Sequence, residues 1–586
     1  MQSPAERPTE GRPQKRPRTI SGRNSNQDQH RPPVVESVAQ TPPTPTTTTT
    51  TTTEQQSAIL VGPAVAEDVE ILQRHISKHD SSNPQPSNPY RLLSRDSSNP
   101  VIYLSVPRSR TGLQTSLYAG KGHLEIVSQI LGPFKNEVIE LYLKWFHSNY
   151  PVVDDSTCEL LRNRDLDSIS PSLLCTIYAA ASPLWAKSDT LKLHPHPDYH
   201  YFWNKAISAL YEDFISPSLA TISSATVEAV GRPSVSIVGN IANCGRTVAL
   251  AQSFGLHRDP SQWNIGAEEK TTRIRLWWGV LINDYWSSIA YGTPPHSIKG
   301  CFDVPLPVIE SLLPAKATTS QRCSSICFLH LCSLTEILGD ILPFVYQLKP
   351  EPQEMIRAVE RLRCSLDDLR SKLPDWLPLP NQPGTSNLWF CFLYTRLLIS
   401  RLSLRAAVLD GEATGTPSNN DRLAELCGTS TAVLDFIISL DESQFQDFWL
   451  PYCGHLLVLA TMVALRCTVE SDTDARSAHI TRLQQFLSRI QFAHDHYEWD
   501  IADYCIERCA GPIAKLAALM TGDSQQAVEN AVFSGGAENG NAQIAPTDED
   551  QTGSFFLSDY LDSTASFDYS WEALWDTPSA ISGFPL

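Results

Sequence analysis

Apolar side chains recur every three to four residues along most of the chain, from about residue 134 to residue 519. This spacing collects apolar side chains on one face of a helix, whereas the side chains of a half-buried strand alternate every second residue. Only residues 101–106 have the pattern of a short strand. We therefore predict an all-α fold, with helices over residues 134–149, 171–185, 199–214, 219–230, 268–291, 320–346, 352–373, 387–409, 422–440, 445–469, 475–493 and 499–519.

Both ends of the chain lack this periodicity. Residues 1–100 are polar and rich in proline and threonine, and residues 522–586 mix small, acidic and aromatic side chains. Segments of this composition bury too little apolar surface to offset the conformational entropy lost on folding. We predict one large multi-helix domain over residues 101–521, flanked by disordered N- and C-terminal segments over 1–100 and 522–586.

The stretch 248–307 is the most distinctive part of the predicted domain. Its second half predicts a buried helix rich in tryptophan, and Gly255 followed by an Asp-Pro pair predicts a turn in front of that helix. The helix also carries Arg273, Arg275 and Asp284 close to its apolar face. Charges in or near a core need partners, because an unpaired buried charge is strongly destabilising. A first apolar helical pattern precedes the turn, and we expect this helix pair to be the rigid centre of the domain.

Charge and cysteine content exclude several classes of protein. The net charge is −18, and eleven acids after Lys515, with no Lys or Arg among them, supply −11 of it, which leaves −7 for the rest. A mildly acidic body is not a general nucleic-acid-binding surface. The 14 cysteines are scattered singly, which indicates free thiols in a reducing, intracellular compartment. The longest apolar run, 456–465, is shorter than the ~20 residues of a membrane span, so we expect no membrane partner.

Two motifs resemble catalytic sites but lack the rest of the machinery. His257, Arg258, Asp259 and Asn264 have the spacing of a protein-kinase catalytic loop, but the chain has no glycine-rich phosphate loop and no D-F-G motif. The structural alternative is a helix end followed by a turn. We expect no enzyme activity from this motif.

The second motif comprises His194, His196, Asp198 and His200, which approach a metallo-hydrolase signature with one residue too many before the last histidine. A weak surface metal site and a turn with Asp198 starting a helix both remain open. A helical metallo-hydrolase is the single enzyme hypothesis that the sequence leaves.

Two segments have the composition of interaction elements. The basic cluster Lys15, Arg16 and Arg18 is typical of a nuclear-import signal, with a solvated basic patch as the alternative. The C-terminal tail interleaves acids with large apolar side chains, a composition typical of a transcriptional activation segment that folds onto a partner's groove. The alternative is a tail that docks onto its own body. The large side chains are Phe555, Phe556, Tyr560, Leu561, Phe567, Trp571, Leu574 and Trp575.

Several motifs together resemble one family. The segments LAQSFGLHRD at 250–259, RIRLWW at 273–278, GTP at 292–294 and DVPLP at 303–307 are similar to the regulatory middle-homology domain of fungal-specific transcription factors, and LYLKWFHSNYPVV at 141–153 resembles the segment that opens this domain. NPVIYLSVPRSRTGLQ at 99–114 resembles nitrogen-regulation co-activators of the TamA type. The signature residues, which we expect to be mainly structural, are Gly255, His257, Arg258, Asp259, Arg273, Trp277, Trp278, Asp284, Pro294 and Asp303.

The resemblance implies a nuclear regulator of RNA polymerase II transcription. Members usually carry an N-terminal Zn2Cys6 cluster, but no cysteine precedes Cys158 in this chain, so no zinc ligand can be assigned and zinc is expected only if such a cluster is missing from this sequence. DNA would then be reached through that missing domain or indirectly, by tethering to another DNA-bound factor. Other expected partners are the transcription machinery or co-activators at the tail, a metabolite, and a second copy or another transcription factor as dimer partner. The alternative is an all-α scaffold or small-molecule sensor that does not bind DNA.

Overall fold

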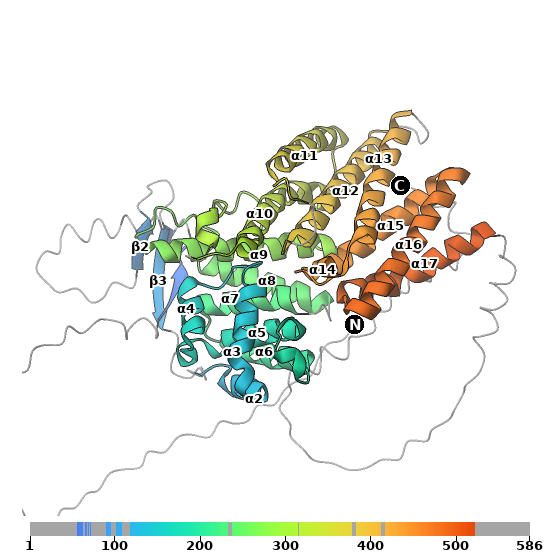
Figure 1. Cartoon of the computed structure of the whole chain (residues 1–586). Helices are drawn as coiled ribbons and strands as arrows, with labels where there is room; N and C mark the ends of the chain where they lie inside the picture. The colour runs from blue at the N-terminus through green and yellow to red at the C-terminus, as the bar shows by residue number, and fades with distance from the viewer. Residues whose placement is uncertain are drawn as a thin grey trace, which may run out of the picture. The chain divides into compact units, whose positions relative to one another are not determined.

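The structure of the protein, a computed structural model, describes residues 56–62, 90–94, 101–107, 118–232, 237–313, 316–377, 382–411 and 417–521, with isolated positions between 65 and 71. Within these ranges the chain is predominantly helical, which confirms the predicted all-α class (Figure 1). The predicted disordered tail at 522–586, the basic cluster and most of the predicted disordered segment 1–100 lie outside the described residues.

The α-helices form most of the described chain. They are α2 (Lys121–Leu131), α3 (Lys135–Leu141), α4 (Asp155–Asn163), α5 (Pro171–Ala181), α6 (Tyr199–Asp213), α7 (Leu219–Gly231), α8 (Ile237–Ser253), α9 (Ala267–Tyr291), α10 (Thr319–Tyr346), α11 (Pro352–Lys372), α12 (Thr385–Leu409), α13 (Pro417–Ser439), α14 (Glu442–Phe445), α15 (Tyr452–Glu470), α16 (Thr473–Tyr497) and α17 (Asp503–Thr521). Shorter 3-10 or π turns are η1 (Gly132–Phe134), η2 (Tyr142–Phe146), η3 (Leu166–Ser168), η4 (Ser182–Lys187), η5 (Leu191–Leu193), η6 (Ile309–Leu312) and η7 (Asp500–Ala502).

The predicted ranges agree with most of these elements, but one range spans two helices, and α2 and α4 were not predicted. The range 445–469, predicted as one helix, contains the end of α14 and most of α15, because the chain breaks before Pro451, which cannot donate a backbone hydrogen bond. Helix α2 was not predicted, since its eleven residues follow a polar stretch and bury only Val127 and Leu131. Short helices with few buried positions leave a weak periodic signal.

A small antiparallel sheet corrects the prediction of a single strand. It has the order β1–β3–β2, with β1 (Gln56–Leu60) and β2 (Tyr90–Ser94) on either side of β3 (Val101–Pro107). Two of its strands therefore lie inside the range 1–100 that we predicted to be disordered, and that prediction is wrong for these residues. The sheet buries Leu93, Val101 and Tyr103 against Trp263 of the α8–α9 connection, so its stability comes from contacts distant in sequence.

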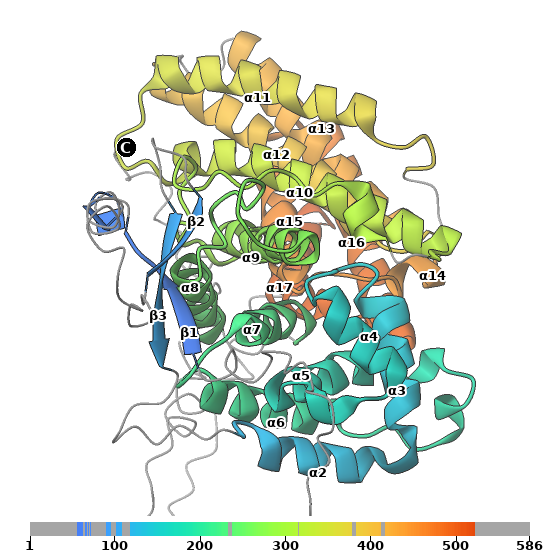
Figure 2. The same ribbon diagram turned by 90° about the vertical axis from the view of Figure 1, so that its left-hand side faces the viewer.

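Helix α9 lies in the middle of the helical body. It packs against α7, α8, α10 and α15, and Figure 2, which looks nearly along it, shows α2 to α6 on one side and α11 to α13 on the other. We predicted one buried face, but nearly every side chain from Thr272 to Ala290 is buried. A helix that is enclosed on all sides is a core helix rather than an amphipathic surface helix.

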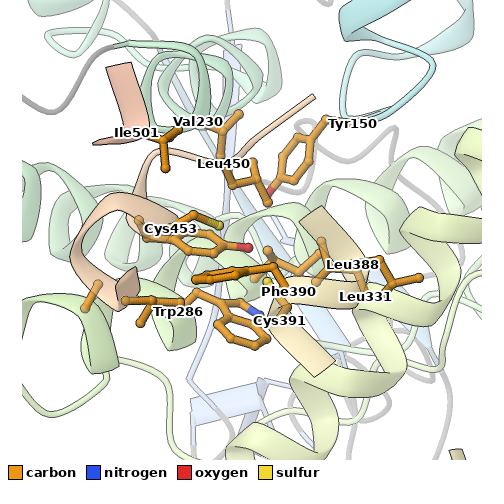
Figure 3. Close-up of a cluster of buried hydrophobic side chains, with 14 of the residues drawn as sticks. Tyr150, Val230, Trp286, Leu331, Leu388, Phe390, Cys391, Leu450, Cys453 and Ile501 are labelled. Atoms are coloured by element: carbon orange, nitrogen blue, oxygen red, sulfur yellow. The ribbon is translucent and has the colours of Figure 1, made fainter. Parts of the chain in front are cut away.

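The core around α9 is aromatic. Trp286 stacks on Tyr452 of α15, with ring centroids 5.5 Å apart, and its indole nitrogen donates to the Thr335 hydroxyl of α10 at 2.9 Å. Figure 3 shows Trp286 beside Phe390, Cys391 and Cys453 in the same buried cluster. Buried aromatic rings contribute large apolar areas, and the hydrogen bond satisfies the indole N–H that burial would otherwise leave unpaired.

Gly279 allows a neighbouring segment to pack directly on the backbone of α9. The Tyr150 hydroxyl donates to the Gly279 carbonyl at 2.6 Å, and a Cβ added at Gly279 would lie 2.4 Å from Cγ1 of Val152. The segment 150–153, at the end of the motif that resembles the opening of the domain, therefore lies directly on the α9 backbone. A larger residue at this position forces that segment away.

Two core helices are long and apolar. By length and hydropathy alone, α10 and α15 would each suffice to cross a membrane, and 67% and 78% of their apolar windows are buried inside the protein. Helices of soluble cores meet the same criteria when they are enclosed on most sides. Each of the 14 cysteines is free, as predicted, and most are buried.

The Gly279 contact makes a testable prediction. Gly279→Ala should lower the free energy of unfolding by ~1–3 kcal/mol, because the stiff Val152 side chain cannot move away without shifting its backbone. Gly428→Ala is the matched control, since its Cβ would meet no atom within 4 Å and Gly428 lies within α13. The control should be neutral or raise the stability by up to ~1 kcal/mol. Urea unfolding of the purified chain measures both; equal stabilities would contradict the close packing.

Candidate functional site

Three charged side chains of α9 lie inside the core. Their side chains are 8% (Arg273), 3% (Arg275) and 0% (Asp284) exposed. Charges buried to this extent need well-formed partners, because removing one partner leaves an uncompensated charge in a medium of low dielectric constant. Each of the three is paired, and each pairing holds a different distant segment against α9.

Arg273 joins α9 to the sheet and to the end of α8. Its guanidinium donates to the Phe254 carbonyl and to the Tyr103 hydroxyl, both at 3.1 Å, and to Glu269 Oε1 at 2.8 Å. The Tyr103 hydroxyl also donates to the Phe254 carbonyl, and the guanidinium lies near the faces of Tyr103 and Trp263. Burial raises the pKa of Tyr103, while the nearby Arg273 opposes the rise. Arg273 thus adds a polar contact to the packing of the small sheet on Trp263.

Arg275 joins α9 to α4 and η6. It donates to Asp155 Oδ1 at 3.0 and 3.1 Å and to the Ser311 carbonyl at 2.8 Å. Asp155 is the first residue of α4, where a negative charge is favourable because the first amides of a helix have no partners within it. This pairing brings together segments that are 120 residues apart.

Asp284 holds the loop that follows α9. Its Oδ1 accepts from the backbone N–H of His296 at 3.0 Å and lies 2.9 Å from His296 Nδ1, and its Oδ2 accepts from the Ser297 N–H at 2.7 Å. The thiol of Cys244 on α8 approaches Oδ1 at 3.7 Å. The hydrogen bond to Asp284 raises the pKa of His296, and burial raises the pKa of Cys244, with Asp284 adding to the rise.

The motif with kinase-like spacing is a turn, as its structural alternative predicted. Gly255 ends α8 with φ 69°, and the Leu256 N–H donates to the Ala251 carbonyl at 3.0 Å, which closes a Schellman motif. The Asp259 N–H donates to Asp303 Oδ1 at 2.6 Å, and Arg258 pairs with Oδ2 of the same carboxylate at 3.3 Å. These residues serve the turn, and no catalytic arrangement results.

The remaining signature residues lie around the same helix. Trp277 is fully buried, and its ring lies 6.1 Å from that of His257, whose pKa is lowered by burial. The indole N–H of Trp278 donates to the Pro305 carbonyl at 2.7 Å, which holds the DVPLP segment that begins at Asp303. Pro294 lies in the loop that Asp284 holds, close to the Asp284 side chain.

The histidines of the metallo-hydrolase motif do not form a ligand set. Asp198 caps α6 by accepting from the N–H groups of His200 and Tyr201, and His196 Nε2 lies 3.0 Å from the Ser182 carbonyl. Among the described residues, the one group of three His, Cys, Asp or Glu side chains placed closely enough to hold a metal ion is Cys244, Asp284 and His296. The metallo-hydrolase hypothesis loses its site, and the turn alternative for Asp198 holds.

Sequence reasoning missed the partners of the α9 charges. Asp155, Tyr103, Cys244 and Ser297 were not singled out, because each lies at least 13 residues from its partner and no local pattern marks it. His296 was visible two residues after the GTP motif, yet its role depends on the fold. The residues predicted for nuclear import (Lys15, Arg16, Arg18) and for activation (Phe555, Phe556, Tyr560, Leu561, Phe567, Trp571, Leu574, Trp575) lie outside the described residues.

Removing the buried carboxylate of α9 tests its structural role. Asp284→Ala should lower the free energy of unfolding by ~3–5 kcal/mol, because two backbone N–H groups and a histidine lose their acceptor inside the core. Asp340→Ala is the matched control: Asp340 of α10 pairs with Lys299 of the same loop but is half exposed, so we expect a loss under ~1 kcal/mol. Thermal and urea unfolding measure both, and a stability of Asp284→Ala like that of the control would refute the role.

Comparison with known proteins places these contacts in a family domain. Residues 139–371 match the family described as the fungal specific transcription factor domain. The match begins in α3 and ends in α11. It therefore contains α9 and the residues that pair with its charged side chains, apart from Tyr103 of the sheet. The range starts close to the segment 141–153 that we expected to open the domain.

Curated relatives are fungal regulators of transcription. An uncharacterized transcriptional regulatory protein of Schizosaccharomyces pombe is 25% identical over 292 residues, which are 50% of this chain and 44% of that protein. The transcriptional activator protein DAL81 of Saccharomyces cerevisiae is 23% identical over 467 residues, 70% of this chain and 46% of that protein. The thiamine repressible genes regulatory protein thi1 of S. pombe is 23% identical over 274 residues, 44% of this chain and 34% of that protein.

The chain spans less than half the length of each of these relatives. Residues 139–371 around α9 are therefore similar to the fungal specific transcription factor domain, in agreement with the motifs, and the similarity is to transcription regulators rather than to enzymes.

Proposed function

We propose that this protein is a nuclear regulator of RNA polymerase II transcription, in which the helical body is the regulatory domain and the acidic tail recruits the transcription machinery or co-activators. The observation that supports it best is the family match over 139–371, because that range contains the α9 helix with its buried charge pairs. Similarity to transcription regulators of two yeasts supports the same role.

The route to DNA is either a zinc cluster outside this sequence or tethering to another DNA-bound factor. The acidic charge of the body supports tethering, since a surface without excess Lys and Arg does not attract the phosphate backbone. A nutrient signal, with nitrogen metabolism as the first candidate, is supported by the TamA-type resemblance at 99–114. The name of the thi1 relative likewise refers to genes repressed by a nutrient, thiamine.

The tail assignment is tested apart from the body. Residues 546–586 fused to an unrelated DNA-binding domain should activate a reporter, because acids keep the large apolar side chains solvated until a partner's groove binds them. Replacing Phe555, Phe556, Tyr560, Leu561, Phe567, Trp571, Leu574 and Trp575 by alanine should abolish the activation.

A matched control keeps both the charge and the aromatic residues. Replacing Ser558, Ser563 and Ser566 of the same segment by alanine should leave reporter activity unchanged, with expression levels checked by immunoblot. A fusion that fails to activate, or alanine variants that activate as strongly as the control, would refute the tail as an activation segment.

Nuclear import is tested on the full chain carrying a fluorescent tag. Neutralising Lys15, Arg16 and Arg18 with alanine should shift the protein from the nucleus to the cytosol, because importin recognition of basic clusters depends on their charge. Arg23→Ala with Arg31→Ala is the control, which removes charge outside the cluster and should leave the protein nuclear. A cytosolic wild-type protein would instead favour the scaffold or sensor alternative.

A further inference from the structure

Three side chains that ligate metals converge where α8, α9 and the loop after α9 meet. Cys244 lies on α8, Asp284 on α9 and His296 in the loop. Their ligand atoms all lie within 4.8 Å of one another. The sequence motifs did not point to this trio, because 40 residues separate the first two members.

One oxygen of Asp284 faces three donors. Oδ1 faces the backbone N–H of His296 at 3.0 Å, the imidazole Nδ1 at 2.9 Å and the Cys244 thiol at 3.7 Å. A carboxylate oxygen offers about two lone-pair positions. Two of the three donors, the imidazole and the thiol, become metal ligands when they give up their protons. The crowding at Oδ1 is therefore relieved if a cation replaces those protons.

The charge of the group fits a divalent cation. Asp284 is fully buried, and within the described chain its ion-pair partner is His296, which is charged only when protonated. A thiolate, a carboxylate and a neutral imidazole around a divalent ion give a net charge of zero. A neutral cluster suits a core position better than a buried carboxylate whose compensation depends on pH.

The two distances to Asp284 Oδ1 lie near those of a zinc site. Ligand bonds of ~2.3 Å to sulfur and ~2.1 Å to oxygen and nitrogen at tetrahedral angles place sulfur and oxygen ~3.6 Å apart, and nitrogen and oxygen ~3.4 Å apart. The structure has 3.7 Å between Cys244 Sγ and Asp284 Oδ1 and 2.9 Å between His296 Nδ1 and the same oxygen. The imidazole would need to move by ~0.5 Å, and its side chain is 37% exposed on a loop.

The neighbouring helix makes room for the imidazole. A Cβ at Gly245 of α8 would lie 2.6 Å from Nε2 of His296, so only glycine allows the ring to rest on the α8 backbone. With that edge of the ring against α8, the Nδ1 edge faces Asp284. The same contact fixes which nitrogen is the ligand.

We propose that Cys244, Asp284 and His296 form a zinc site within the regulatory domain. Thiolate and imidazole ligands favour zinc over calcium or magnesium, and three protein ligands leave a fourth position beside the half-exposed histidine. The site is separate from the N-terminal Zn2Cys6 cluster of the family, and it does not depend on the proposed role in transcription. Bound zinc would join α8, α9 and the loop 293–303, so that zinc raises the stability of the domain.

Metal content of the purified full chain tests the site. After saturation with zinc and dialysis, the wild type should hold about one equivalent, and zinc should raise its Tm. His296→Gln should hold less than a tenth of the wild-type amount and lose the Tm response, because glutamine keeps an N–H for Asp284 but ligates zinc poorly. His200→Gln, at an exposed histidine of α6, is the matched control and should behave as the wild type.

Cobalt identifies the sulfur ligand. Co²⁺ in place of zinc should give a thiolate charge-transfer band in the near ultraviolet, which Cys244→Ser should remove and Cys364→Ser, at an exposed cysteine of α11, should retain. If Cys244→Ser fails to fold, the zinc content of His296→Gln still tests the site, because the His296 side chain is half exposed. A wild type without bound zinc, an unchanged zinc content in His296→Gln, or cobalt bound without a thiolate band each overturns the proposal. None of these outcomes bears on activation by the tail.

Discussion

The burial of three charged side chains within one helix is the constraint on which the rest of the domain depends. Arg273, Arg275 and Asp284 cannot remain in the core unless their partners arrive with suitable geometry. Those partners come from the sheet, from α4 and η6, and from the loop after α9. Folding of α9 into the core is therefore coupled to the docking of segments before and after it, and loss of any one pairing exposes the others to strain.

Buried charge pairs of this kind specify how the segments are arranged more than they add to the free energy of unfolding. A buried ion pair gains little over an apolar pair of the same volume, because desolvation offsets most of the attraction, whereas a mispaired charge is costly. Arg273 can be satisfied only with Tyr103 and the Phe254 carbonyl on the same side, which fixes where the sheet lies. The sheet also takes part in two small apolar clusters, one with Trp263 and one with Ala66 and Val69, so its position is defined by Arg273 and these apolar contacts together.

The sequence predicts where the helices lie better than it predicts the contacts between residues that are far apart in the chain. The α9 range and the turn at Gly255 were predictable because a long apolar period and a glycine before an Asp-Pro pair act locally. The strands β1 and β2 were not, since five residues are too few to show an alternating pattern among polar neighbours. Tyr103 lies 170 residues from Arg273 and Asp155 lies 120 residues from Arg275, so only the folded chain brings them together. The metal-ligand trio was hidden for the same reason.

The position of Asp284 gives the loop after α9 a direct connection to the core. Its carboxylate accepts from the backbone of residues 296 and 297, while the helix that carries it is enclosed by α7, α8, α10 and α15. A ligand that adds a bond at this carboxylate and binds the folded state more tightly than the unfolded one shifts the stability of the whole domain by mass action. His296 is half exposed and Asp284 is fully buried. A ligand that binds His296 at the surface can therefore change the stability of the core without a large conformational change.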